Sequence, residues 1–590
     1  MARLRPPVAP QNFSIRFTRQ RPVRWTETLI RPVSHCEITF GDKVGVGCSY
    51  CDAGEAERIW QGASSSGAGD FLSRQEEVAD SLQERVAKSL EAISGTAGPA
   101  IWNNPLANNE PVASAKDNSS TSGDDASLFI SSSYNCRNPD AAAVISGIDT
   151  ALWQLQAQLQ GVELAELLSA AWSSENGATP FRGFSRQNQG RGGPVAYCTV
   201  EIPFSFDPEE AIGLLAAKLE RLMRCYHLKA FKLFVGPPFG LFDNKVGVGE
   251  VPVVQVDHTA RQRQRQHEPA PTPPIKMGGA SAVDALFPPD VQLAWARQVF
   301  HGARRIVGPD IHLFVDLMGF QEEWQTGSEQ VFFVETLMRQ VFEPVGIGFC
   351  EEPFAPNALE DYVAFGLRDE QHQNTNRQSC EKIAIAGCES LIGVEAFRPW
   401  MTAPARRHSP SFNYPRPPVQ LFQPDTCVAG GVSVVLRLAK MWEEEERKAA
   451  ERQKRRVVGS PVKQSHQSGS SRVNLQDYER NQPKNTSPAP PAPAEPDSPC
   501  SFSPRRTSDG QFAFPQLRGI LPHSFATAKA WETDFELVQW LSLSSGSNMP
   551  PLGPNLIELP EHLLEELLAE EKGGRFQIDP GSGRCSYLVK

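Results

Sequence analysis

The chain has 590 residues, enough for two or three domains, and its 40% hydrophobic content allows a sizeable core. The 49 prolines and 45 glycines indicate long irregular segments as well. A net charge of −11 argues against nucleic acid as a partner. No apolar run approaches the ~20 residues that a membrane-spanning helix needs, so we expect no membrane segment.

The twelve cysteines follow no repeating interval. Cys48 and Cys51 form one C-x-x-C without a second pair, so unrelated cytosolic thiols are favoured over a zinc or redox site. The first 26 residues carry six arginines and no acid, which is typical either of an organelle transit segment or of a basic tail before a first strand. We therefore expect a cytoplasmic protein, with a mitochondrial location as the alternative.

The N-terminal part is expected to be an α+β unit. Residues 12–19 and 35–40 are strand-like, with a turn at Gly41-Asp42. Residues 62–135 are rich in Ser, Gly and Asn apart from a helical stretch near 74–94, and apolar residues at helical spacing predict a helix over 140–170.

After residue 190 the chain alternates between strand-like and helix-like segments. Strands are predicted at 194–200, 229–234, 312–317, 346–352, 383–389, 419–425, 518–523 and 555–559. Helices are predicted at 208–224, 290–306, 328–341, 357–367, 393–401, 430–454, 526–543 and 561–571. Eight strands alternating with helices predict a closed β/α barrel of the TIM type rather than an open sheet.

Polar or Pro-rich inserts interrupt this alternation at 250–282, 369–380, 404–418 and 445–515, and their composition predicts disorder. Three of them connect a helix to the next strand, so they lie on the barrel face opposite the carboxyl ends of the strands. Only 250–282 follows a strand and could overhang a site there. The expected domains are an N-terminal cap (1–185), a barrel (186–559) and a C-terminal segment (560–590) that returns to the cap.

Three predicted strands stop at carboxylates, namely Asp316, Glu351 and Glu389. Successive strand ends of a parallel barrel lie side by side, so these side chains should converge. Three converging oxygen ligands predict a site for a hard divalent cation, most simply Mg²⁺.

More ionisable residues lie on the neighbouring strands: Lys232, Asp425, His523 and Glu558. An Asp beside a His would orient the imidazole and raise its basicity. Each residue alone could be structural. Seven such groups in or at the ends of seven strands are harder to explain that way, because charged groups are rarely buried without partners.

The stretch from about 140 to 560 resembles the mandelate racemase and muconate lactonizing group of the enolase superfamily. The resemblance rests on the order of several segments, with EEP at 351–353 and the Gly-Gly after Asp425 the most telling. The segments are GIDTALWQLQAQLQGVELAELL, KAFKLFVGPPFG, FVDLMG, FCEEPFAPNALEDY, IAIAGCESL, QPDTCVAGGVSVVLRLAKM and LPHSFATAKAW.

The resemblance implies roles for these residues. Asp316, Glu351 and Glu389 match the three metal ligands, and Asp425 with His523 matches an Asp–His dyad. Glu558 matches an acidic residue of the eighth strand, and Lys232 matches the first lysine of a Lys-x-Lys pair.

Departures from the family pattern bear on mechanism. Phe234 stands where many members carry the second lysine, so no amine can act on that face of the substrate. Met318 stands where members often have Asn, and Cys48 where many have Glu. Racemisation through two bases is therefore not expected.

The resemblance implies a Mg²⁺-dependent hydro-lyase that dehydrates a sugar acid, an aldonate or aldarate, to a 2-keto-3-deoxy acid. His523 would be the base and then the acid, held by Asp425, while Lys232 stays protonated. The alternatives are a cycloisomerase or epimerase on the same scaffold, and a catalytically silent barrel used for binding. The expected partner is a small-molecule carboxylate, and the family implies a homo-oligomer.

Overall fold

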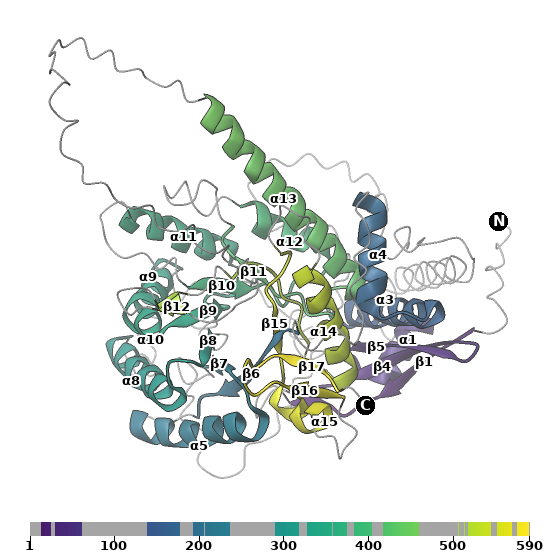
Figure 1. Ribbon diagram of the computed structural model, residues 1–590, viewed down its shortest axis with the longest axis horizontal. Helices are drawn as coiled ribbons and strands as arrows, with labels where there is room; N and C mark the ends of the chain where they lie inside the picture. Colours follow the sequence, from purple (N-terminus) through teal and green to yellow (C-terminus); the bar gives the residue numbers. More distant parts are fainter. Residues whose placement is uncertain are drawn as a thin grey trace, which may run out of the picture.

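A computed structural model gives the structure of the chain (Figure 1). It describes residues 13–24, 30–61, 139–176, 193–203, 205, 207–235, 289–317, 327–356, 358–373, 383–403, 417–459, 505–506, 512–513, 517–524, 526–543, 551–568 and 575–588. The predicted helix near 74–94 and the insert at 250–282 lie outside these ranges, as does most of the insert at 445–515.

The N-terminal unit is a three-stranded antiparallel sheet in the order β1-β4-β5, packed against a long helix. Both predicted strands are present, and a third follows the turn at Gly41. The elements are β1 (Phe13–Arg19), β4 (Ser34–Phe40), β5 (Lys43–Ser49), α1 (Ala53–Gln61), α3 (Pro139–Gln160) and α4 (Leu164–Asn176), with a short pair β2 (Val23–Arg24) and β3 (Ile30–Arg31).

Two glycines of β5 explain how closely α3 approaches this sheet. A Cβ at Gly45 would lie 1.9 Å from the Ala151 carbonyl oxygen, and one at Gly47 would lie 1.8 Å from the Gly147 oxygen. The backbone of α3 therefore rests directly on the strand, and no larger residue fits at either position.

Eight parallel strands form the second sheet, in the order β14-β11-β10-β9-β8-β7-β6-β15. They are β6 (Val195–Glu201), β7 (Ala230–Phe234), β8 (His312–Asp316), β9 (Ile347–Glu351), β10 (Ala384–Gly387), β11 (Leu421–Phe422), β14 (Gly519–Ile520) and β15 (Leu556–Glu558). The first strand, β6, pairs with the last, β15, and Ile520 N donates to Leu552 O at 2.9 Å between the β14 and β15 segments. The predicted TIM-type fold is confirmed as a modified β/α barrel with an N-terminal antiparallel sheet as its cap.

Helices surround the strands (Figure 1). They are α5 (Pro208–Tyr226), α8 (Pro289–Val307), α9 (Gly327–Leu337) with the π-helix η5 (Met338–Phe342) and α10 (Glu343–Val345), α11 (Leu359–Gln373), α12 (Val394–Thr402), α13 (Gly431–Gly459), α14 (Ala528–Leu543), η7 (Glu561–Leu563) and α15 (Leu564–Leu568). The apolar outward residues of the strands and the inner faces of these helices form the largest core cluster. The far end of α13 extends well beyond the barrel.

Strand alternation places the chemistry of the barrel in layers. A buried apolar layer inside the barrel includes Phe314 and Phe349, whose rings stack at 4.2 Å, together with Leu421, Leu521 and Leu556. Side chains two positions further along a strand face the same side. The residue two places after each of these five is polar, so a polar layer lies above the apolar one at the carboxyl ends of the strands.

The cap is tied to the barrel where α3 meets the start of α13. Asp149 accepts hydrogen bonds from the backbone N of Ser433 at 2.9 Å and from its hydroxyl at 2.6 Å, and Ser146 accepts one from the N of Gly430 at 2.9 Å. Gly431 has φ +74°, and a Cβ there would lie 2.6 Å from Asp149 Oδ2. Gly431, the second glycine of the Gly-Gly after Asp425, is thus required by this contact.

The C-terminal pair β16 (Phe576–Ile578) and β17 (Cys585–Tyr587) contacts barrel elements. Cys585 N donates to Pro194 O at 2.8 Å beside β6, and the Phe576 ring packs on Trp531 of α14 at 4.7 Å. The domain boundaries themselves, including the expected return of 560–590 to the cap, stay a prediction.

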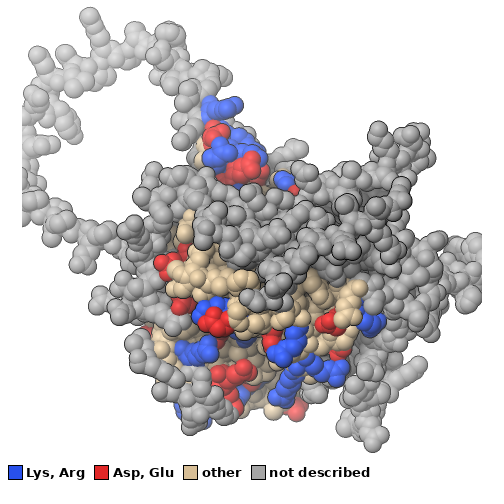
Figure 2. Space-filling view, turned by 90° about the vertical axis from the view of Figure 1, so that its right-hand side faces the viewer, with Lys and Arg blue, Asp and Glu red and all other residues tan. Residues whose placement is uncertain are grey.

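Acidic and basic side chains are interspersed over the described part of the face in Figure 2. None of the helices in the described ranges combines the length and apolar character needed to span a bilayer.

Candidate functional site

The seven residues singled out from the sequence all lie in the polar layer of the barrel. Lys232, Asp316, Glu351 and Glu558 are within β7, β8, β9 and β15, and Glu389 follows β10. Asp425 and His523 extend β11 and β14 and pair through a parallel bridge. Each of the seven is at most 8% exposed.

Lys232 lies among three carboxylates. Its Nζ is 3.0 and 2.9 Å from the two oxygens of Glu351, 3.0 Å from Glu558 Oε2 and 3.7 Å from Asp316 Oδ2. Burial alone would lower the pKa of Lys232, but the charges of Glu351, Glu558 and Asp316 outweigh burial and raise the pKa well above its usual value. These contacts favour the protonated ammonium form of Lys232.

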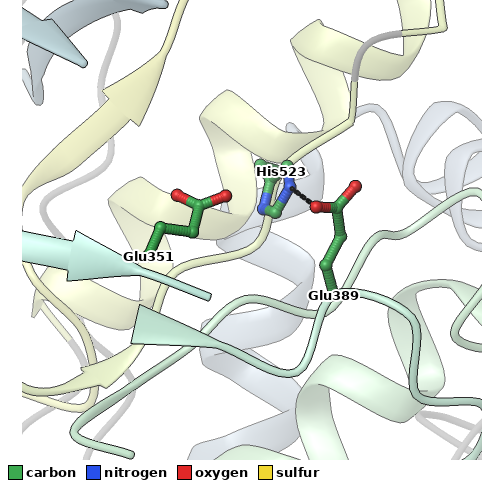
Figure 3. A group of neighbouring side chains, drawn as sticks. All are labelled: Glu351, Glu389 and His523. Carbon is green, nitrogen blue, oxygen red and sulfur yellow. Dashed lines mark ion pairs between the residues drawn. The ribbon is translucent and has the colours of Figure 1, made fainter. Parts of the chain in front are cut away.

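Glu351, Glu389 and His523 form the group most able to hold a metal ion in the described part of the chain. Each offers a ligand atom, and these atoms lie within 4.8 Å of one another. Figure 3 shows the His523 ring between the two carboxylates, with its Nε2 3.7 Å from Glu389 Oε2. Asp316, the third predicted ligand, lies beside Glu351 in the strand register and near Lys232.

The protonation of His523 follows from Glu389. Burial would lower the pKa of His523, but the Glu389 carboxylate 3.7 Å away outweighs burial and raises the pKa to about 10. Burial raises the pKa of Glu389, yet the nearby His523 brings it below its usual value. The pair is an imidazolium–carboxylate at neutral pH.

Asp425 lies next to His523 along the sheet, and its carboxylate has a backbone partner. Asp425 Oδ1 accepts a hydrogen bond from the backbone N of Cys427 at 2.8 Å. Burial and the charge of Glu389 raise the pKa of Asp425 to about 8. In this structure the partner that controls the proton on His523 is therefore Glu389, and the Asp425–His523 dyad stays a prediction.

Three further polar residues in the site were not found from the sequence. Tyr197 donates to Glu558 Oε2 at 2.9 Å, and Thr199, two residues along β6, also hydrogen-bonds Glu558. Gln423 donates to Glu351 Oε2 at 2.7 Å. Thr199 and Gln423 lie in the polar layer, whereas the Tyr197 ring lies in the apolar layer and its hydroxyl reaches Glu558. A lone Tyr, Thr or Gln in an apolar run has no distinctive sequence signal.

Backbone strain occurs next to two of the carboxylates. Glu352 and Cys388 have φ +41° and +74°, which are uncommon for residues other than glycine. Cys388 breaks the strand alternation just before Glu389 and so lets that side chain reach the polar layer. Strain held by the surrounding fold is frequent where functional side chains are positioned.

The charge, the geometry and the ligand types of the site fit a divalent cation. Five buried carboxyl groups lie near two basic side chains, and Glu389 Oε1 is buried without a hydrogen-bond partner among the described residues. Two ligand atoms on one Mg²⁺ lie at most about 4.2 Å apart, so a 4.8 Å spread needs only a small side-chain movement. Carboxylate oxygens are also the ligands that Mg²⁺ prefers.

The departures from the family pattern are partly visible. Phe234 ends β7, pairs with Asp316 in the register and is 9% exposed, so it forms an apolar wall at the edge of the site. Cys48 lies in β5 of the cap and is buried. Met318 falls outside the described residues.

Comparison with known proteins gives a match to one family model, described as "Enolase C-terminal domain-like", over residues 215–450. No curated protein matches the chain.

Several solved structures are similar to the chain at low identity. An enolase from Bradyrhizobium complexed with magnesium and mandelic acid is 14% identical, over 74% of this chain and 79% of that one, with a TM-score of 0.36. A member of the enolase superfamily from Salmonella Typhimurium is 12% identical over 98% and 94%, with a TM-score of 0.43. A mandelate racemase/muconate lactonizing enzyme-like protein from Rubrobacter xylanophilus is 12% identical over 98% and 93%, with a TM-score of 0.42. At these values the likeness carries no functional argument.

The family match spans the middle of the barrel, from α5 through most of α13. It includes five of the seven predicted site residues, and the other two, His523 and Glu558, lie outside it. Residues 215–450 of the chain thus match the family of enolase C-terminal domain-like proteins.

Proposed function

We propose that the chain is a Mg²⁺-dependent dehydratase of sugar acids, which removes the proton next to the carboxylate of an aldonate or aldarate. The observation that supports this most is the buried cluster of Glu351, Glu389 and His523 at the carboxyl ends of the barrel strands. Glu351 and Glu389, with Asp316 as the predicted third ligand, would hold the cation. A bound Mg²⁺ supplies the positive charge that stabilises a carboxylate whose neighbouring carbon has lost a proton.

The polar layer supplies the other groups that such a reaction needs. Lys232 stays an ammonium and gives a fixed positive charge for the substrate carboxylate. His523 is the group that transfers the proton, and it must be neutral to accept one. A cation on Glu389 would offset the charge that now holds the proton on His523, so the pKa of His523 would fall toward its usual range.

Dehydration on one face of the substrate follows from the residues on β7. Phe234 gives an apolar wall where a second amine would be needed for inversion. His523 would take the proton from the carbon next to the carboxylate and then return it to the departing β-hydroxyl, which leaves as water. The product is a 2-keto-3-deoxy acid, formed by syn elimination.

A cycloisomerase or epimerase would share the first proton transfer and is kept as the alternative activity. A catalytically silent barrel is the second candidate class, and one observation favours it. Lys232 contacts both oxygens of Glu351, so part of the negative charge of the carboxylates is neutralised without a metal ion.

Metal binding separates the silent barrel from the enzymes. Thermal unfolding is followed while Mg²⁺ is added to the full chain, to Glu351→Gln and to Glu561→Gln, a matched control whose carboxylate pairs with Lys218 on the surface. We expect Mg²⁺ to raise the melting temperature of the wild type and the control but not of Glu351→Gln. An equal response of all three, or of none, would count against the metal site.

Turnover tests the reaction itself. The chain is incubated with Mg²⁺ and a library of aldonates and aldarates, and 2-keto acid formation is measured. We expect product from the wild type and from His301→Asn, an exposed control on α8, and none from His523→Asn. Exchange of the substrate proton in D₂O without keto acid would favour epimerisation over dehydration.

The remaining expectations stay predictions: a small carboxylate as the substrate, a cytoplasmic or mitochondrial location, and a homo-oligomeric assembly.

A further inference from the structure

A second group of reactive side chains lies where the cap meets the barrel, outside the polar layer. Cys48 on β5 and Cys427, in the turn after β11, belong to one small buried cluster with Val33, Tyr50 and Ala530. The pKa of each thiol is affected by the other, and the two residues are 3% and 2% exposed. The fold thus places two cysteines that are 379 positions apart in one small buried cluster.

The surroundings of Cys48 favour its thiolate. Its Sγ is 3.6 Å from the hydroxyl of Thr527, which is 3.1 Å from His35 Nε2. Thr527 precedes α14 and accepts from the backbone N of Ala530, so Cys48 lies at the positive end of a helix. Burial would raise the pKa of Cys48, but hydrogen bonds to Cys427, His35 and Thr527, with the charge of His35, lower it to about 5.

Cys427 differs from its neighbour. Burial, the bond to Cys48 and the nearby acidic groups raise the pKa of the Cys427 thiol. One low-pKa thiol beside one protonated thiol is the arrangement in which the first is oxidised and the second resolves it. A zinc site is a poorer fit, because among the described residues the group with ligand atoms within 4.8 Å is Glu351, Glu389 and His523, and not this one.

We propose that Cys48 and Cys427 form a disulfide under peroxide, which links the cap covalently to the active-site end of the barrel. The Cys48 thiolate attacks one peroxide oxygen, the O–O bond breaks, and a sulfenic acid forms as hydroxide leaves and is protonated. The Cys427 sulfur then attacks the Cys48 sulfur, the S–O bond breaks, and water leaves. Two thiols and one hydrogen peroxide give one disulfide and two waters.

The link would act on the catalytic end of the barrel through Cys427. The backbone N of Cys427 donates to Asp425 Oδ1 at 2.8 Å, and Asp425 pairs with His523 across the sheet. A covalent bond from β5 to this turn would also hold the cap in place over the strand ends. This regulatory consequence rests on the proposed function, whereas the disulfide itself does not.

Mass spectrometry tests the disulfide without any assay of turnover. The reduced full chain is treated with hydrogen peroxide, blocked with N-ethylmaleimide and digested with trypsin without reduction. We expect peptide 44–58 linked to peptide 408–437, which is reversed by dithiothreitol. The link should persist in Cys51→Ser, which removes the other cysteine of peptide 44–58, and in Cys225→Ser, an exposed control. It should be lost in Cys427→Ser.

Stability gives a second readout. The oxidised wild type should melt at a higher temperature than the reduced wild type, because the link restricts the unfolded chain. Cys427→Ala should show no such shift on oxidation. If the reduced variant melts at the same temperature as the reduced wild type, the missing shift is not caused by misfolding. Oxidation of Cys48 to a sulfinic acid without a linked peptide, or a link from Cys51 instead, would overturn the proposal. A linked peptide with no dehydratase activity would leave the disulfide established and refute the function alone.

Discussion

Replacing Lys232 by methionine tests the electrostatic account of the site most directly. Lys232 is 1% exposed, and its ammonium lies 2.9–3.0 Å from oxygens of Glu351 and Glu558. Methionine fills similar space but leaves these buried carboxylates without their positive partner. Removing one member of a buried ion pair costs about 3–5 kcal/mol of unfolding free energy. We expect the melting temperature without added metal to fall by roughly 5–10 °C.

Added Mg²⁺ should restore part of this loss. A cation bound at 100 times its dissociation constant adds about 2.7 kcal/mol to the stability of the folded state. Because Lys232 no longer competes for Glu351, the variant should gain more from Mg²⁺ than the wild type does. The deficit should also grow from pH 5 to pH 8, since buried carboxylates without a partner are protonated at low pH and must ionise as the pH rises.

Thermal unfolding at several Mg²⁺ concentrations measures all three effects. Lys218→Met is the matched control, because Lys218 pairs with Glu561 at 2.8 Å on the surface and such pairs contribute about 0–1 kcal/mol. Two results would show that Lys232 does not neutralise the buried carboxylates. One is a melting temperature of Lys232→Met equal to that of Lys218→Met, and the other is a Mg²⁺-induced shift equal to that of the wild type.

Three other predictions concern the scaffold. Burial and the charge of Arg304 lower the pKa of His312 to about 4, so the free energy of unfolding decreases as the pH falls from 6.5 toward 4. Urea titrations should show that His312→Gln makes the decrease between pH 7 and pH 5 smaller by about 2 kcal/mol. Gly431→Ala should destabilise the chain by about 2 kcal/mol more than Gly161→Ala, because both have positive φ but only Gly431 approaches Asp149; equal losses would exclude the contact. Arg304→Met should cost about 2–4 kcal/mol in the same assay, since Arg304 donates to four backbone carbonyls, and a neutral result would show that water replaces it.

The sequence was informative where strand periodicity and position agree. Asp316, Glu351 and Glu558 each lie two residues after an apolar side chain inside the barrel, so a pattern of period two was enough to place them in one layer. Glu389 also reaches this layer, although the positive φ of Cys388 breaks the alternation and no sequence signal marks that change. The third strand of the cap was missed, because its Gly-rich sequence at 43–49 has little strand propensity and is determined by contact with α3.

Which partner each ionisable group takes could not be predicted. The expectation that Asp425 charges His523 came from their neighbouring strands. The structure places the Glu389 carboxylate 3.7 Å from the imidazole, and burial and the charge of Glu389 raise the pKa of Asp425. Which groups pair depends on differences of about one or two ångström in the distances between them and on how deeply each is buried. Neither can be inferred from the order of the strands.

The excess of carboxylates links the stability of this barrel to its chemistry. Asp316, Glu351, Glu389, Glu558 and Asp425 are buried together, and two basic side chains cannot neutralise five acids if all are ionised. The repulsion between these buried charges is reduced when some of the carboxyl groups keep their protons, which the raised pKa values of Glu351 and Asp425 indicate, or when a cation binds.

Protons and Mg²⁺ therefore compete for the same carboxylate oxygens. A metal that displaces protons as it binds should therefore bind more tightly as the pH rises, and the midpoint of the Mg²⁺-induced thermal shift should move to lower concentration between pH 6 and pH 8. A midpoint independent of pH would mean that the carboxylates are already ionised and balanced by the chain alone, which is what a silent barrel requires.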